Sequence, residues 1–144
     1  MQEQSYAKHA KFVPMFHYVL FGIIVLTFIG SLVNVWQSLG DHERIYSASL
    51  IAAITVALVL LFFFTRIFSM GVQDRAIRAE ENLRHFALTG KLMDPRLTIK
   101  QIVGLRFASD AEFVELARKA AEGSMSPDEI KKSVQNWRAD HDRA

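Results

Sequence analysis

The stretch LVLLFFFTRIFSMGVQDRAIRAEENLRHFAL, from Leu58 to Leu88, begins as an apolar run and ends as a densely charged one. It contains no proline and a single glycine, and no pattern typical of a helix end follows until Gly90 and Pro95. We therefore predict one uninterrupted helix from Ala48 to Leu88, which at 1.5 Å per residue would be about 60 Å long.

Beyond Arg66 the apolar residues of this helix keep a helical spacing. They recur in steps of three and four residues, which places them on one face: Phe68, Val72, Ala76, Ala79, Leu83 and Phe86. The remaining positions carry both signs of charge, whereas a helix lying flat on a membrane prefers Lys and Arg. We interpret residues 66–89 as an amphipathic stem that packs on protein, either its own tail, another copy or a different partner. We expect Leu83 and Phe86 to contact the C-terminal tail.

Two long segments without Asp, Glu, Lys or Arg precede the stem. One has 29 residues, between Lys11 and Asp41, and the other has 21, between Arg44 and Arg66. A bilayer core of about 30 Å needs roughly 20 apolar residues in a helix. The sequence therefore predicts a transmembrane hairpin over residues 13–65, with spans at about 13–39 and 46–65. A chain this short could not cover two such helices all round, which argues against two buried core helices.

Charge predicts how the hairpin is oriented. The connecting segment GDHER is very short, so the two spans must be antiparallel and both termini must lie on one side. Basic residues in short flanking segments mark the cytoplasmic side. They occur in the N-terminal tail, residues 1–12, and after the second span, at Arg66, Arg75, Arg78 and Arg84. We predict that both termini are cytoplasmic. The first apolar run is too long for a signal peptide, so we read it as a retained anchor.

Small residues recur every four positions on both spans. Ser49, Ala53 and Ala57 form one such face, and Gly30 with Asn34 and Thr27 with Ser31 form others. Faces of this kind let helices approach closely in lipid. They fit packing within the hairpin or packing against another membrane subunit.

The last part of the chain, residues 97–144, predicts a small helical domain. Three S/T-x-x-E/Q patterns mark helix starts: Thr98 with Gln101, Ser109 with Glu112, and Ser126 with Glu129. Inward faces would be formed by Ile99, Ile102 and Val103; by Phe113, Leu116, Ala117 and Ala120; and by Ile130, Val134 and Trp137. Trp137 would either close this bundle against the stem or anchor a partner.

The sequence predicts no catalytic, cofactor-binding or metal-ligating residue. It has no cysteine, no histidine pair at i, i+4, and no H-E-x-x-H, Walker or G-x-S-x-G motif. Neither span contains Asp, Glu, Lys or Arg, which argues against a self-contained ion pathway. A net charge of +2 and a tail that carries both signs almost equally argue against nucleic acid as a partner.

The segment LTIKQIVGLRFASDAEFVELARKAAEGSMSPDEIKKSVQNW (Leu97 to Trp137), behind HAKFVPMFHYVL and IGSLVN, resembles an uncharacterised family of small two-span bacterial membrane proteins. The resemblance covers nearly the whole chain, and LRFASD and IKKSVQNW are its most specific parts. It implies a bacterial inner-membrane protein of the same layout and supplies no catalytic or ligand residue. Some members carry an automatic label of ABC transporter permease, which two spans without intramembrane charge do not support.

Two hypotheses about function follow. The first is a non-catalytic integral membrane subunit or scaffold that docks onto copies of itself or onto a larger membrane complex. The alternative is a membrane-anchored binding or regulatory module whose cytoplasmic helices sense a soluble partner or the membrane surface. An enzyme or transporter that acts alone is disfavoured because no motif or intramembrane charge supports it.

Overall fold

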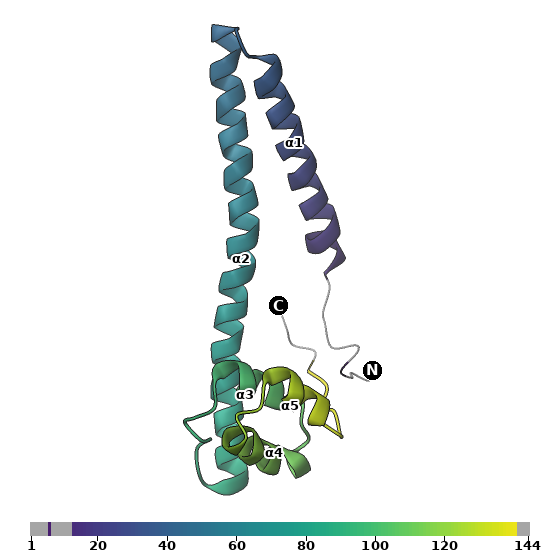
Figure 1. Ribbon diagram of the computed structural model, residues 1–144, viewed down its shortest axis with the longest axis vertical. Coiled ribbons are helices and arrows are strands. Elements are labelled where there is room, and N and C mark those ends of the chain that lie inside the picture. Colours follow the sequence, from purple (N-terminus) through teal and green to yellow (C-terminus); the bar gives the residue numbers. More distant parts are fainter. Residues whose placement is uncertain (1–5, 7–12, 141–144) are drawn as a thin grey trace. The chain divides into compact units, whose positions relative to one another are not determined.

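The computed structural model describes Tyr6 and residues 13–140, and every regular element in this part of the chain is helical (Figure 1). In chain order the elements are the π-helix Met15–Leu20, α1 (Phe21–Gln37), α2 (His42–Thr89), α3 (Ile99–Leu105), α4 (Asp110–Glu122) and α5 (Pro127–Ser133). The predicted all-helical class is confirmed for these residues. Apart from Tyr6, the N-terminal tail predicted at residues 1–12 lies outside the described residues, as do residues 141–144. The chain divides into two compact units: Phe12–Phe68 form one, and Tyr6 and the residues from Ser69 onward belong to the other.

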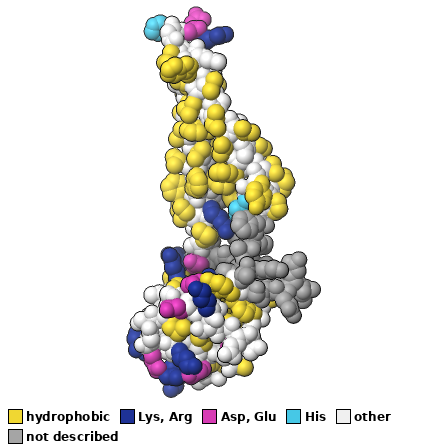
Figure 2. Space-filling view, turned by 45° about the vertical axis from the view of Figure 1, so that its right-hand side comes forward, with side chains coloured by type: hydrophobic (Ala, Val, Ile, Leu, Met, Phe, Trp, Pro, Cys, Tyr) yellow, Lys and Arg dark blue, Asp and Glu magenta, His cyan; other side chains and the backbone are white. Residues whose placement is uncertain are grey.

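The first unit is a helical hairpin. Met15–Gln37 and α2 are both long and apolar enough to cross a membrane. Hydrophobic side chains cover much of the visible face of both helices (Figure 2). Large apolar side chains point away from the hairpin, and Leu26, Ile54 and Leu61 are 72%, 60% and 61% exposed.

The turn of the hairpin is shorter than the sequence predicts. Gly40 has a φ of +92°, a conformation that glycine adopts without strain. The Asp41 carboxylate then accepts hydrogen bonds from the backbone N–H groups of Glu43 (3.1 Å) and Arg44 (3.2 Å). This is the bonding of an N-terminal cap, and it allows α2 to begin at His42 rather than at residue 46.

A narrow polar and aromatic seam holds the hairpin helices together. The Ser31 hydroxyl of α1 and the Thr55 hydroxyl of α2 are buried and 2.9 Å apart, within hydrogen-bonding distance. Phe16 stacks on Phe62 with ring centroids 4.5 Å apart. Within the hairpin the buried residues are spaced by seven, as in the seam of a coiled coil: Ile24, Ser31 and the C-cap Ser38 on the side of α1, and Ala48 and Thr55 on α2.

Helix α2 continues without a break through Arg66 for a total of 48 residues. It ends where the sequence predicts, because Gly90 has a φ of +73° and its N–H donates to the carbonyl of Phe86 at 2.7 Å. A glycine in this left-handed conformation is a common helix terminator.

The second unit packs α3, α4 and α5 around one apolar core. All three predicted helix starts, at Thr98, Ser109 and Ser126, are confirmed as capping boxes. The most completely buried large side chains are Phe107, Phe113, Leu105 and Ile130. Gly104 permits the contact between α3 and α5, because a Cβ added there would lie 3.2 Å from the backbone oxygen of Pro127.

The end of α5 differs from the prediction. The helix stops at Ser133, and Val134 is extended, although its side chain remains buried. Trp137 therefore does not share a helical face with Ile130 and Val134. It forms an isolated antiparallel bridge with Ala108, and its ring lies 4.8 Å from that of Phe107.

Candidate interaction surfaces

A buried ion pair joins the stem part of α2 to the helical bundle. Glu81 and Arg84 lie one helical turn apart and contact the bundle, and Ile77, one turn before Glu81, is also buried. The Arg84 guanidinium is 3.0 Å from the Glu81 carboxylate and 2.6 Å from that of Asp110, and it donates to the carbonyl of Ala108 at 2.8 Å. This one side chain therefore links α2 to the loop before α4 and to the first residue of α4.

Aromatic and electrostatic contacts complete the environment of this pair. The Arg84 guanidinium lies over the ring of Phe113, 4.2 Å from its centroid. On the other side of Glu81, Arg138 approaches to 3.7 Å. A buried carboxylate is tolerated when cations and hydrogen bonds replace its lost water. Glu80, Glu81, Arg84, Asp110 and Arg138 line a hollow at this place, and all of them except Glu80 take part in these ion pairs.

The apolar stripe of the stem is largely exposed. Phe68, Val72, Leu83 and Phe86 are 67%, 69%, 69% and 51% exposed, and the alanines between them are exposed as well. The prediction that Leu83 and Phe86 would pack on the tail is therefore wrong. Arg84 determines which face of the stem meets the bundle, because it binds the carbonyl of Ala108, the carboxylate of Asp110 and the ring of Phe113. The apolar stripe lies on the opposite side of the helix and therefore points outward.

The small residues of the hairpin divide between an inner and an outer face. Of the predicted contact residues, Ser31 lies in the seam between α1 and α2. The others are exposed: Gly30, Asn34, Ser49, Ala53 and Ala57. Sequence reasoning missed Thr55, the partner of Ser31, because an isolated threonine in an apolar helix gives no periodic signal. These exposed small residues remain candidates for the second predicted role, which is packing against another membrane subunit.

Glu112 fastens the last described segment of the chain to the start of α4. Its carboxylate accepts hydrogen bonds from the backbone N–H groups of Gln135 and Asn136, both at 3.0 Å, and of Ser109 at 3.3 Å. Burial raises the pKa of Glu112, but these backbone hydrogen bonds together outweigh it, and the pKa lies below its ordinary value. The same bonds take up the N–H groups that would extend α5, which explains why that helix ends before Trp137.

Trp137 is half-buried at the edge of the bundle core, against Phe107. The backbone around it is held on both sides, since Ser109 N–H donates to the carbonyl of Asn136 (3.1 Å) and Arg138 N–H donates to that of Phe107 (2.7 Å). This position favours the first of the two predicted roles, in which Trp137 closes the bundle.

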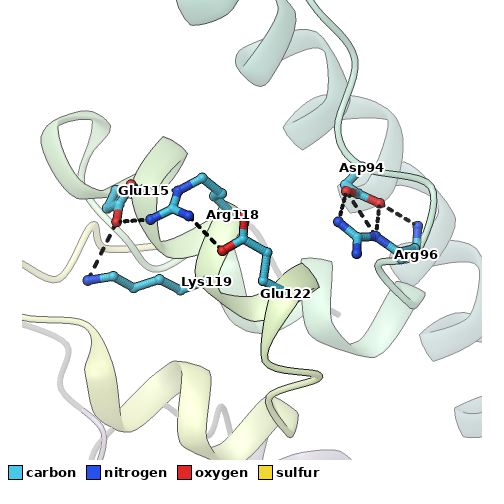
Figure 3. A network of polar contacts seen from close by, with 6 residues as sticks. All are labelled: Asp94, Arg96, Glu115, Arg118, Lys119 and Glu122. Atoms are coloured by element: carbon cyan, nitrogen blue, oxygen red, sulfur yellow. Dashed lines mark hydrogen bonds and ion pairs between the residues drawn. The ribbon is translucent and has the colours of Figure 1, made fainter.

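The outer surface of the bundle is evenly charged. On α4, Arg118 pairs with Glu115 and Glu122, and Lys119 approaches Glu115 (Figure 3). Asp94 and Arg96 form a separate pair in the segment before α3, and hydrogen bonds from Arg96 lower the pKa of Asp94 to about 2. Exposed pairs of mixed sign add little stability.

Tyr6 contacts helix α5 of the bundle. The Tyr6 hydroxyl donates a hydrogen bond to the Asp128 carboxylate at 2.6 Å, and the Lys132 ammonium lies 5.5 Å from the centre of the tyrosine ring. The hydrogen bond to Asp128 raises the pKa of Tyr6. Among Tyr6 and residues 13–140, no group of three or more His, Cys, Asp or Glu side chains is placed to hold a metal ion.

Comparison with known proteins places the chain by family. A family model described as a family of unknown function (DUF6526) matches residues 1–144. Neither the curated proteins nor the solved structures gave a match.

Proposed function

The chain belongs to this family of unknown function, and from its own residues we propose that it is a non-catalytic membrane scaffold. In this proposal a two-span hairpin anchors it in the bacterial inner membrane. The stem and the helical bundle lie in the cytoplasm and dock onto copies of the chain or onto a larger membrane complex.

The exposed apolar surface of the hairpin is the observation that carries the proposal. Side chains such as Leu26, Ile54 and Leu61 surround both helices, and only a narrow seam is buried. In water, so large a contiguous apolar surface would drive association or aggregation. In a bilayer the same side chains meet lipid, and the backbone polar groups are satisfied within each helix.

The polar contacts favour a topology with both flanking segments on one side. Tyr6, which precedes the first span, bonds to Asp128 of α5, which follows the second span. The basic residues after the second span favour the cytoplasm for this side.

The arrangement of the stem supports a docking role. Its charged face is already occupied, because Glu81 and Arg84 bind the bundle. Its apolar face is left exposed, from Val72 to Phe86. A rigid helix that offers a free apolar stripe suits protein contact better than catalysis.

Membrane extraction and topology reporters test the proposal. After alkaline carbonate treatment the chain should stay in the membrane pellet. A reporter fused after residue 144 should read cytoplasmic, and a tag within Asp41–Arg44 should read external. Release into the supernatant, or the reverse pattern of reporters, would refute the anchor or its orientation.

Purification in mild detergent, followed by mass spectrometry, separates the scaffold from the alternative of a regulatory module. Stoichiometric membrane subunits, or additional copies of the chain, would support a scaffold. A soluble partner present in less than stoichiometric amounts would favour a membrane-anchored binding module and would count against the scaffold.

A further inference from the structure

The stem stripe has the spacing of a coiled-coil seam. Its residues alternate in steps of four and three: Val72, Ala76, Ala79, Leu83 and Phe86. A repeat of this kind keeps one face turned toward a partner helix over successive turns. All five side chains are exposed in the single chain. The residues that hold the bundle, Ile77, Glu81 and Arg84, occupy the opposite side of the same helix.

From this seam we infer that the stem pairs with the stem of a second copy of the chain, in parallel and in register. The inference rests on the proposed membrane anchor. Val72, Ala79 and Phe86 occupy one of the two core positions of the seam, and Ala76 and Leu83 occupy the other. The two alanines at its centre allow close approach, and the larger residues close its ends.

The charges beside the seam select a second copy in parallel orientation. Arg75 and Glu80 are exposed and flank the seam on opposite sides, five residues apart. In a parallel pair this separation places Arg75 of one copy beside Glu80 of the other, and the symmetry repeats the contact. In an antiparallel pair, Arg75 would face Asn82 and Glu80 would face Gln73, so no ion pair would form. Charge complementarity therefore favours the parallel arrangement.

The membrane would favour a pairing for which the short seam alone is too weak. Residues 72–86 cover about two heptads, and so short a coiled coil is marginal between free chains in water. Copies anchored in one bilayer with the same orientation are already parallel, and anchoring raises their effective concentration. A flat position on the membrane surface fits the stripe less well, because charges of both signs flank it.

Cysteine cross-linking in isolated membranes tests this pairing, since the natural chain has no cysteine. Ala79→Cys places one thiol at the centre of the seam, where a parallel, in-register pair brings it close to its own copy. Arg78→Cys is the matched control, because it is exposed and adjacent but lies off the seam. A disulfide needs Cα atoms within about 7 Å, so mild oxidation should give at least about fivefold more dimer from Ala79→Cys than from the control.

Charge reversal provides a second test of orientation in the Ala79→Cys background. Arg75→Glu would set like charges against Glu80 of the other copy and should lower the dimer yield about threefold. Adding Glu80→Arg should restore the yield, because both pairs are rebuilt with their signs exchanged. Unchanged yields in the single reversal, or no recovery in the double, would overturn the parallel register.

The outcomes separate this inference from the proposed function. Equal cross-linking at both positions, no cross-link at Ala79→Cys, or a product whose mass shows a different protein would each overturn pairing between copies. Carbonate extraction of the same membranes reports on the anchor independently. A chain that resists extraction but does not cross-link refutes the pairing alone, whereas a chain released by carbonate refutes the anchor.

Discussion

Replacement of Arg84 by methionine is the most informative perturbation of the junction between stem and bundle. Methionine keeps much of the aliphatic packing but removes the contacts with Glu81, Asp110 and the carbonyl of Ala108. Glu81 would then remain buried, with Arg138 at 3.7 Å as its remaining ion-pair partner.

The cost follows from these contacts. Removal of one partner of a buried ion pair destabilises a protein by about 3–5 kcal/mol. Arg138 remains near Glu81 and offsets part of this loss. The Asp110 side chain is 70% exposed, so water screens the ion pair between Arg84 and Asp110, and breaking it costs little. We therefore expect Arg84→Met to lower the free energy of unfolding of the bundle by about 2–3 kcal/mol. A small domain has about 5 kcal/mol in total, so the loss should be large enough to measure easily.

Trp137 fluorescence in a Trp36→Phe background provides the assay, because Trp137 is then the single tryptophan and lies in the bundle. Urea unfolding of the full chain in detergent gives the stability. Arg118→Met, which breaks the two exposed ion pairs with Glu115 and Glu122, serves as the control and should leave the urea midpoint nearly unchanged. The double variant Glu81→Leu/Arg84→Met should recover most of the loss, because no charge is left buried alone. An unchanged midpoint in Arg84→Met would refute the role assigned to this junction.

Three further predictions concern the bundle. Glu112→Gln should destabilise the bundle by about 1 kcal/mol at neutral pH. The pKa of Glu112 is lower in the folded state than in the unfolded state. Its contribution to stability is therefore complete above the unfolded-state pKa and is lost as the pH falls through the folded-state pKa. A variant that loses stability equally at all pH values would contradict this. Gly104→Val should separate α3 from α5 and cost about 2 kcal/mol, measured as a lower melting temperature, and an unchanged value would show that Pro127 moves freely. Trp137→Ala should make the C-terminal segment protease-sensitive in the purified chain, and an intact segment would show that Trp137 does not close the core.

The sequence was a good guide wherever structure is decided locally. Thr98, Ser109 and Ser126 each lie three residues before a side chain that can return their hydrogen bond, so the helix starts could be located. The same holds for Gly90, whose freedom at positive φ ends α2. The uninterrupted helix through Arg66 also follows from local pattern, since neither proline nor a helix-stop pattern occurs between Ala48 and Leu88.

The sequence was a poor guide wherever partners lie far apart in the chain. Periodicity identified the two faces of the stem but not which of them meets the bundle, because the partners of Arg84 at Ala108 and Asp110 lie 24 and 26 residues away. Trp137 has a helical spacing from Ile130 in the sequence, but the helix ends before it. The N–H groups of Gln135 and Asn136 donate to Glu112 instead, which lies 23 and 24 residues earlier in the chain. In the hairpin, the bond between Ser31 and Thr55 spans 24 residues.

Accessibility of single cysteines on α2 in native, inverted membrane vesicles tests the central claim most directly. A water-soluble maleimide would be applied to Ile54→Cys, in the apolar half of the helix, and to Arg78→Cys, on the exposed side of the stem. The account predicts that Arg78→Cys is labelled at once, whereas Ile54→Cys is labelled only after detergent denatures the sample. Labelling of Ile54→Cys in intact vesicles at the rate of Arg78→Cys would place that part of α2 in water and would contradict the membrane hairpin.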